Sequence, residues 1–222
     1  ALVSDISWRD KRFMLQILIR HGESLSNRDG RVQGQADISL TEVGRQQAKA
    51  VASWCQSQQF QSPCELWSSP LCRARETAEI IGKATGLSVN LKDDLVELNA
   101  GVFQGHLWDD LADRFPEDVA RWRSGDLDFQ IPDGESRRQL AQRGGQALQS
   151  LSCRSAESII IVAHGGVLTA ALGLLLGRDH PLLAEAVERP FTRLPALGNC
   201  SVSQLQWPGP ELISFNGTDH LP

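Results

Sequence analysis

Two short apolar segments of this chain end in the same way, with a histidine followed by a glycine. Residues 158–163 read SIIIVA, a run without charge and rich in β-branched residues, and His164 and Gly165 follow directly. Such a run is typical of a central parallel strand that is buried on both faces. Residues 13–19 form a second apolar run, which leads through an arginine to His21. The chain therefore predicts two buried strands that each present a histidine at the carboxyl end.

Helix signals separate the strand signals along the chain. Thr41 is placed as the N-cap of one helix, and Gly86 as the residue that closes another. The expected helices cover residues 41–58, 71–85, 137–151 and 167–176, and the further strands cover 64–67, 88–91, 200–206 and 211–215, the last two as a hairpin. Strands that alternate with helices predict an α/β fold with a mostly parallel central sheet and helices on both faces.

Residues 97–135 lack this alternation and mix aromatic and acidic residues with prolines and glycines. They predict a helical insertion over the active site. We expect one domain over residues 1–222, with its core in 13–96 and 136–216. The aromatic side chains of the insertion are expected to pack it rather than to bind substrate. They are Trp108, Phe115, Trp122 and Phe129.

Composition limits the kinds of partner. Of the 222 residues, 41% are hydrophobic, and 22 basic residues against 27 acidic ones give a net charge of -5. This balance argues against nucleic acid or an acidic membrane surface as the main partner. It leaves anionic small molecules open, because a few arginines can make one site positive.

Five scattered cysteines without a C-x-x-C pair favour reduced thiols and argue against a zinc site. The longest apolar run, 167–176, is too short to span a bilayer. The N-terminal residues 1–13 contain no hydrophobic signal core. A soluble cytoplasmic protein, monomeric or homodimeric, is expected.

Ligands of parallel sheets bind in the crevice beyond the carboxyl ends of the strands. The charged or titratable residues expected there are Arg20, His21, Arg73, Glu97 and His164. Two arginines and two histidines would form a positive pocket, and the guanidinium fork binds phosphate oxygens in pairs. The N-terminus of the helix that begins near Gly166 is expected to add N–H groups to this pocket. The predicted occupant is a dianionic phosphoryl group.

Histidine offers chemistry that arginine lacks. A neutral imidazole nitrogen can attack phosphorus and hold the phosphoryl group covalently. A backbone carbonyl that accepts from the other ring nitrogen would fix the tautomer. Gly22, directly after His21, is expected to let backbone and ligand approach closely. The departing alkoxide needs a proton, so a carboxylic acid is expected near the pocket.

Six peptides follow one another in a set order, namely LIRHGES at 18–24, NRDGRVQGQADISLTEVGRQQA at 27–48, SSPLCRARETA at 68–78, PDGES at 132–136, VAHGG at 162–166 and GNCSVS at 198–203. In this order they resemble the histidine phosphatase superfamily, also called phosphoglycerate mutase-like. Each peptide alone is a weak signal, but the match covers nearly the whole chain.

The resemblance implies a role for each matching residue. His21 is implied as the nucleophile that becomes phosphohistidine. Arg20, Arg73 and His164 are implied as the phosphate pocket, with His164 also stabilising the transition state, and Gly165 is placed among the substrate-binding residues. No metal and no cofactor are implied, because arginine and histidine neutralise the phosphate charge.

Asn27 and Gln33 are implied as further pocket or substrate contacts, although Asn27 fits a turn cap equally well. Arg31 fits either a substrate contact or a solvent-facing position. Glu23 and Ser24 either tune the histidine or merely finish the turn.

Glu97 is implied as the proton donor and later as the base for water. The tryptophan-acid pair usual after this glutamate is replaced here by Phe103 and Gln104. Asp93 and Asp94 therefore remain second choices for the proton donor.

The predicted function is hydrolysis of a small phosphorylated metabolite through phosphorylated His21. One alternative is a cofactor-dependent phosphoglycerate mutase, whose relatives resemble one another in a longer lid rich in arginine and tyrosine. Residues 103–135 are short by that standard, and the chain contains no tyrosine, which favours hydrolysis. Another alternative is an inactive binding protein, against which the intact set of site residues argues.

Overall fold

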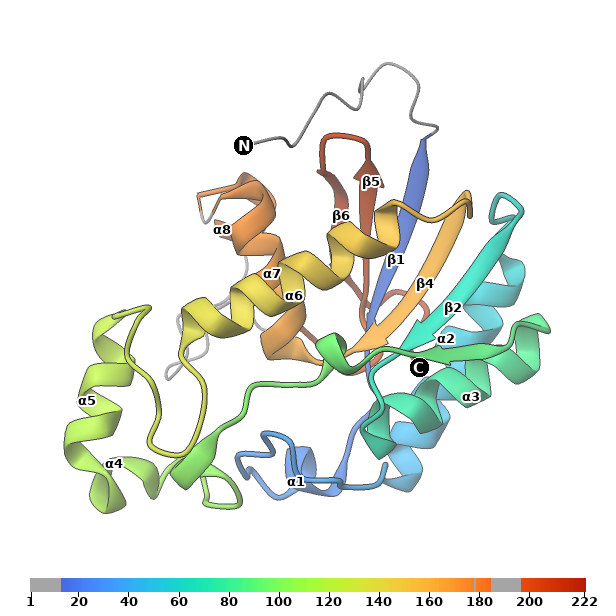
Figure 1. Ribbon diagram of the computed structural model, residues 1–222. Coiled ribbons are helices and arrows are strands. Elements are labelled where there is room, and N and C mark those ends of the chain that lie inside the picture. The colour runs from blue at the N-terminus through green and yellow to red at the C-terminus, as the bar shows by residue number, and fades with distance from the viewer. Residues whose placement is uncertain (1–12, 178, 185–196) are drawn as a thin grey trace.

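The computed structural model describes residues 13–177, 179–184 and 197–222 and shows a single α/β domain (Figure 1). The strands are β1 (Met14–Arg20), β2 (Cys64–Ser68), β3 (Val89–Leu91), β4 (Ser158–Ala163), β5 (Val202–Trp207) and β6 (Glu211–Gly217). The longer helices are α2 (Glu42–Ser57), α3 (Cys72–Thr85), α5 (Pro116–Ser124), α6 (Arg137–Ser152) and α7 (Gly165–Leu176). The short helices include α1 (Leu25–Arg28), η2 (Asp93–Leu95), η3 (Gly101–Phe103), α4 (Leu111–Arg114) and α8 (Pro181–Ala184).

The strands form one sheet in the order β3-β2-β4-β1-β5-β6. Strands β3, β2, β4 and β1 pair in parallel, whereas β5 pairs antiparallel with both β1 and β6. At the carboxyl end of the central pair, Arg20 lies opposite Ala163. His21 and His164 therefore leave neighbouring strands at the same level. The mostly parallel sheet is confirmed.

Helices cover both faces of the sheet, with α2 and α3 on one side and α6 and α7 on the other (Figure 1). Strand β4 is buried along its whole length. Its residues Ile160 and Val162 pack in the cluster of α2 and α3, whereas Ile159 and Ile161 pack in the cluster of α6 and α7. Burying each such side chain contributes about 1.5–3 kcal/mol, so the apolar strand is held centrally between the two layers.

Local signals set the helix ends. Thr41 Oγ1 accepts a hydrogen bond from Gly44 N at the start of α2. Gly86 closes α3 in the left-handed conformation, with φ 76°. Both predictions are confirmed. Helix α7 starts two residues earlier than predicted, because His164 is its N-cap and the His164 carbonyl accepts from Leu168 N.

The insertion contributes η3, α4 and α5, and the latter two lie beyond the carboxyl edge of the sheet (Figure 1). Its apolar side chains, among them Phe103, Trp122 and Phe129, form a cluster of their own with Val32 from the loop after α1. This packing explains why the segment shows no strand or long helix pattern. The exact boundaries of core and insertion stay a prediction.

Within the described ranges, no helix combines the length and the apolar character needed to cross a membrane. The prediction about a signal segment concerns residues that lie, except for Phe13, outside those ranges.

Candidate active site

The carboxyl ends of β1, β4 and β2 bring the predicted residues together. Arg20 is the last residue of β1, His21 follows it, and His164 follows β4. Arg73 lies in the first turn of α3, shortly after β2. Arg20, His21 and Arg73 line a cavity of about 110 Å³. The pocket at the sheet edge therefore has the basic lining that the sequence predicts.

His21 is held in one orientation by the backbone of the residue that follows it. Its Nδ1 lies 2.7 Å from the carbonyl oxygen of Gly22, so Nδ1 carries the hydrogen and donates it. Arg73 Nε donates to His21 Nε2 over 3.3 Å. The lone pair of the ring is therefore on Nε2, beside the arginine, as the predicted nucleophile requires.

Gly22 packs against the start of α2, and the close approach of a ligand to this glycine stays a prediction. A Cβ at this position would lie 2.4 Å from the carbonyl oxygen of Gly44, so the start of α2 leaves no room for a side chain here. Glu23 belongs to the same contact, because its Oε1 accepts from Thr41 Oγ1 over 2.6 Å and its carbonyl accepts from Thr41 N. Gly22 and Glu23 therefore hold the segment after β1 against the start of α2.

His164 lies behind His21, with 5.1 Å between the ring centroids. It is fully buried and does not itself line the cavity. Its Nε2 lies 2.8 Å from Ser69 Oγ, and Nδ1 has no hydrogen-bond partner among the described residues. Burial, and then the charge of Arg73, lowers the pKa of His164 well below its usual value. The ring is therefore neutral at neutral pH.

The two arginines reach backbone carbonyls around the cavity. Arg20 Nη1 donates to the Leu197 carbonyl over 2.5 Å. Arg73 is fully buried, and its Nη1 and Nη2 donate to the carbonyls of Ala36 and Gly34 over 2.7 and 2.8 Å. Burial lowers the pKa of Arg73 to about 10, so the guanidinium stays charged at neutral pH.

Glu97 lines the cavity with its carboxylate at the N-terminus of α7. Its Oε2 accepts from Gly166 N over 2.8 Å, and its Oε1 accepts from Val167 N and Leu98 N over 3.0 and 2.8 Å. This corrects one expectation, because the N–H groups of Gly166 and Val167 bind the glutamate rather than standing open to a phosphate. Gly165 lines the cavity as predicted.

Asn27 and Gln33 line the cavity too, and Ser24 links them. Ser24 Oγ donates to Gln33 Oε1 over 2.6 Å. Asn27 caps the first turn of α1 together with Ser24, and its Oδ1 accepts from Asn199 Nδ2 over 3.1 Å. Asn27 therefore has the structural role that was one of its two alternatives, at a position that also faces the cavity.

The second choices for the proton donor do not line the cavity. Asp94 forms an ion pair with Lys92 at 3.0 Å and is half exposed, and Asp93 is likewise absent from the cavity wall. The residues that replace the usual tryptophan-acid pair have structural contacts. Phe103 is buried in the cluster of the insertion, and Gln104 Oε1 accepts from Gln35 N over 2.9 Å.

Sequence reasoning missed part of the cavity wall. All four aromatic residues of the insertion were predicted to pack only. Phe115 and Phe129 do so, whereas Trp108 and Trp122 also line the cavity. Arg137 also lines the cavity, with its guanidinium carbon 3.9 Å from the centre of the Trp122 ring. The one available signal was the position of Arg137 directly after PDGES.

Arg31 also lines the cavity, where its Nη1 donates to the carbonyl of Gly105. In the described part of the chain, no group of three or more histidine, cysteine, aspartate or glutamate side chains is arranged to hold a metal ion.

Known proteins of similar sequence or fold include a mutase and two phosphatases. A Probable phosphoglycerate mutase GpmB from Escherichia coli is 37% identical over 202 residues, which cover 87% of this chain and 86% of the relative. A mycobacterial glucosyl-3-phosphoglycerate phosphatase has a TM-score of 0.76 at 28% identity, covering 93% of this chain and 100% of that one. Phosphoserine phosphatase from Entamoeba histolytica in complex with 3-phosphoglyceric acid has a TM-score of 0.77 at 28% identity, covering 94% and 100%.

The family model of the histidine phosphatase superfamily (branch 1) matches residues 16–212, a span that contains the whole cavity wall described above. The chain belongs to this superfamily.

Proposed function

We propose that the protein is a phosphomonoesterase that hydrolyses a small phosphorylated metabolite through a phosphohistidine on His21. The observation that carries this proposal is the His21 ring, whose Nδ1 is held by the Gly22 carbonyl while Nε2 lies beside Arg73. A neutral imidazole in this tautomer is a nucleophile, and the adjacent guanidinium stabilises the charge of the phosphoryl group.

In the first step, His21 Nε2 forms a bond to phosphorus, and the bond from phosphorus to the leaving oxygen breaks. The electron pair goes to that oxygen, which takes a proton from the Glu97 carboxyl and departs as an alcohol. In the second step Glu97 takes a proton from water, whose oxygen attacks phosphorus. The P–N bond breaks, its electron pair returns to Nε2, and inorganic phosphate is released.

Arg20 and Arg73 are proposed to bind the phosphoryl oxygens throughout both steps. His164, which the sequence placed in the phosphate pocket, does not line the cavity. It is proposed to stabilise the transition state as an uncharged ring that packs against His21. Asn27, Gln33 and Gly165 are proposed as further substrate contacts, since all three lie on the cavity wall.

The part of the cavity wall that the insertion contributes favours hydrolysis over transfer of the phosphoryl group to another hydroxyl. That wall is built from Trp108, Trp122 and apolar neighbours, and the chain has no tyrosine. The second candidate is a phosphoglycerate mutase, which the identity to the GpmB relative supports. An inactive binding protein is the weakest alternative, because the site residues expected for catalysis are all present.

We place this reaction in the cytoplasm, because all five cysteines lie in the described ranges and none is in a disulfide. Independence from metal ions is part of the proposal.

The test measures phosphate release from a panel of phosphomonoesters and, in parallel, interconversion of 2- and 3-phosphoglycerate. We expect phosphate release that EDTA leaves unchanged, and a phosphoenzyme that is stable in base, labile in acid and absent in His21→Ala. His106→Ala, outside the cavity wall, is the matched control. Rapid interconversion without net phosphate release reverses the ranking of hydrolase and mutase. Loss of activity with EDTA contradicts the metal-free step, and full activity of His21→Ala contradicts the nucleophile.

A further inference from the structure

The backbone that carries Glu97 is held by one arginine of α6. Arg143 Nη1 donates to the carbonyls of Asp94 and Val96 over 2.9 and 2.8 Å, and Nη2 donates to the Glu97 carbonyl over 3.3 Å. Three carbonyls within four residues thus accept from a single guanidinium. The planar fork of arginine can make such a set of bonds, whereas the ammonium of lysine cannot reproduce its geometry.

Glu135, the glutamate of the PDGES peptide, holds this arginine in place. Arg143 Nε and Nη2 donate to Glu135 Oε1 and Oε2 over 3.1 and 3.0 Å, and both side chains are 20% exposed. Glu135 also fixes the chain just after the catalytic acid, because its Oε2 accepts from Asn99 N and its N donates to the Asn99 carbonyl. The pair therefore holds the backbone on both sides of Glu97.

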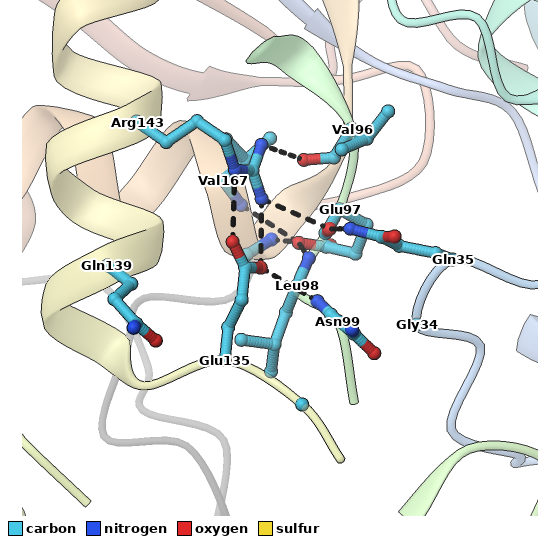
Figure 2. Close-up of polar contacts among 12 residues, drawn as sticks. Gly34, Gln35, Val96, Glu97, Leu98, Asn99, Glu135, Gln139, Arg143 and Val167 are labelled. Atoms are coloured by element: carbon cyan, nitrogen blue, oxygen red, sulfur yellow. Dashed lines mark hydrogen bonds and ion pairs between the residues drawn. The ribbon is translucent and has the colours of Figure 1, made fainter. Parts of the chain in front are cut away.

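Figure 2 shows how these contacts surround the Glu97 backbone. On the opposite side, Gln35 Nε2 donates to the Glu97 carbonyl over 3.0 Å. The carboxylate of Glu97 meanwhile lies at the start of α7, bonded to Gly166 N and Val167 N. The contacts of its backbone and of its carboxylate together hold the Glu97 side chain at the cavity wall.

We propose that Arg143 and Glu135 are positioning residues, which hold Glu97 where its carboxyl group reaches the leaving oxygen and the attacking water. The inference rests on the proposed function of Glu97. It predicts that loss of the pair damages proton transfer and leaves phosphate binding and attack by His21 largely intact.

Substrates with different leaving groups separate this role from simple stabilisation of the fold. An alkyl phosphate needs a proton on its leaving oxygen, whereas p-nitrophenolate departs without one because it is a weak base. For Arg143→Met and Glu135→Gln we expect kcat on an alkyl phosphate to fall by about 10²-fold, with KM little changed. The phosphorylation step with p-nitrophenyl phosphate, read as the burst of p-nitrophenol, should change by less than about 3-fold.

Because the second step also uses Glu97, the burst in these variants should be followed by slow turnover, with the phosphoenzyme accumulating. Arg138→Met is the matched control. Arg138 lies on the same helix and pairs with Asp128 at the surface. Its loss should change none of these values.

A double-mutant cycle with Glu97→Gln gives the decisive comparison. If Arg143 acts through Glu97, then Arg143→Met costs less than about 3-fold in the Glu97→Gln background. Arg143→Lys should lose nearly as much as Arg143→Met, because the bonds to three carbonyls need the fork. Thermal unfolding accompanies each variant, and Glu135→Gln, which keeps the side-chain volume, serves if Arg143→Met does not fold.

Equal losses on both substrates, or full additivity with Glu97→Gln, overturn this inference while the proposed function stands. Absence of phosphate release and of a phosphoenzyme in the wild-type protein overturns the proposed function, and the inference with it.

Discussion

The exits of β1 and β4 begin with similar sequences and have different surroundings. At the β1 exit, His21 reaches the cavity, and the residues after it pack against the start of α2. At the β4 exit, His164 is fully buried and occupies the N-cap position of α7. The histidine-glycine pattern thus fixes the level at which each ring leaves the sheet. The elements that follow decide whether the ring meets substrate or supports its neighbour.

The largest difference between the two exits should appear when each ring is removed. His21→Ala should lower kcat by about 10⁴-fold or more and abolish the phosphoenzyme. His164→Ala should lower kcat by about 10²–10³-fold, because it removes a stabilising group and not the nucleophile. Rapid-quench measurement of the phosphoenzyme checks both. A phosphoenzyme that persists in His21→Ala and disappears in His164→Ala would exchange the two assignments.

A smaller effect is expected from adding one methyl group at the β4 exit. A Cβ at Gly166 would lie 2.4 Å from Glu97 Oε1, whereas one at Gly165 would meet nothing closer than Arg20 at 3.6 Å. Gly166→Ala should therefore displace the carboxylate and lower kcat on an alkyl phosphate by about 10²-fold. Gly165→Ala should lower kcat on the same substrate by a smaller factor. Steady-state kinetics with both variants checks this, and the reverse order would mean that the Glu97 carboxylate is not held at α7.

The smallest effect concerns stability and pH. Burial holds the pKa of His164 well below its usual value, so the unfolded chain binds a proton that the folded protein excludes. The contribution of His164 to the free energy of unfolding is therefore fully present above about pH 6.5. It is lost as the pH falls below that value, by at most about 1.4 kcal/mol per pH unit. His164→Gln should flatten the pH dependence of the free energy of unfolding between pH 7 and 5, measured by urea denaturation. Parallel curves for both proteins would contradict the buried neutral ring.

Much of the fold could be predicted because its signals are local. Strand β4 is uncharged and β-branched over its whole length, and Thr41 and Gly86 have cap chemistry that needs no tertiary information. The convergence of His21, His164 and Arg73 followed from parallel strands whose carboxyl ends share one edge.

The rest of the site depends on contacts between distant parts of the chain. Glu97 was expected from its motif, but its bonds to the start of α7 join residues about seventy positions apart. Arg143 belongs to no recognisable motif, because the carbonyls to which it donates lie 46 to 49 positions earlier in the sequence. Side chains in the insertion, such as Trp122, are oriented by packing that has no period in the sequence.

The pairing of Arg20 with Ala163 has a consequence for how the length of this chain can change. The two histidines follow residues that pair with each other. Deletion of one residue within β1 or β4 would therefore shift one ring by about 3.3 Å along the strand, and would turn side chains of that strand to the opposite face of the sheet. Residues added to the surface of the insertion leave that pairing untouched. Relatives that differ in substrate are therefore expected to gain and lose residues between Gln104 and Pro132, and to keep the spacing within both strands.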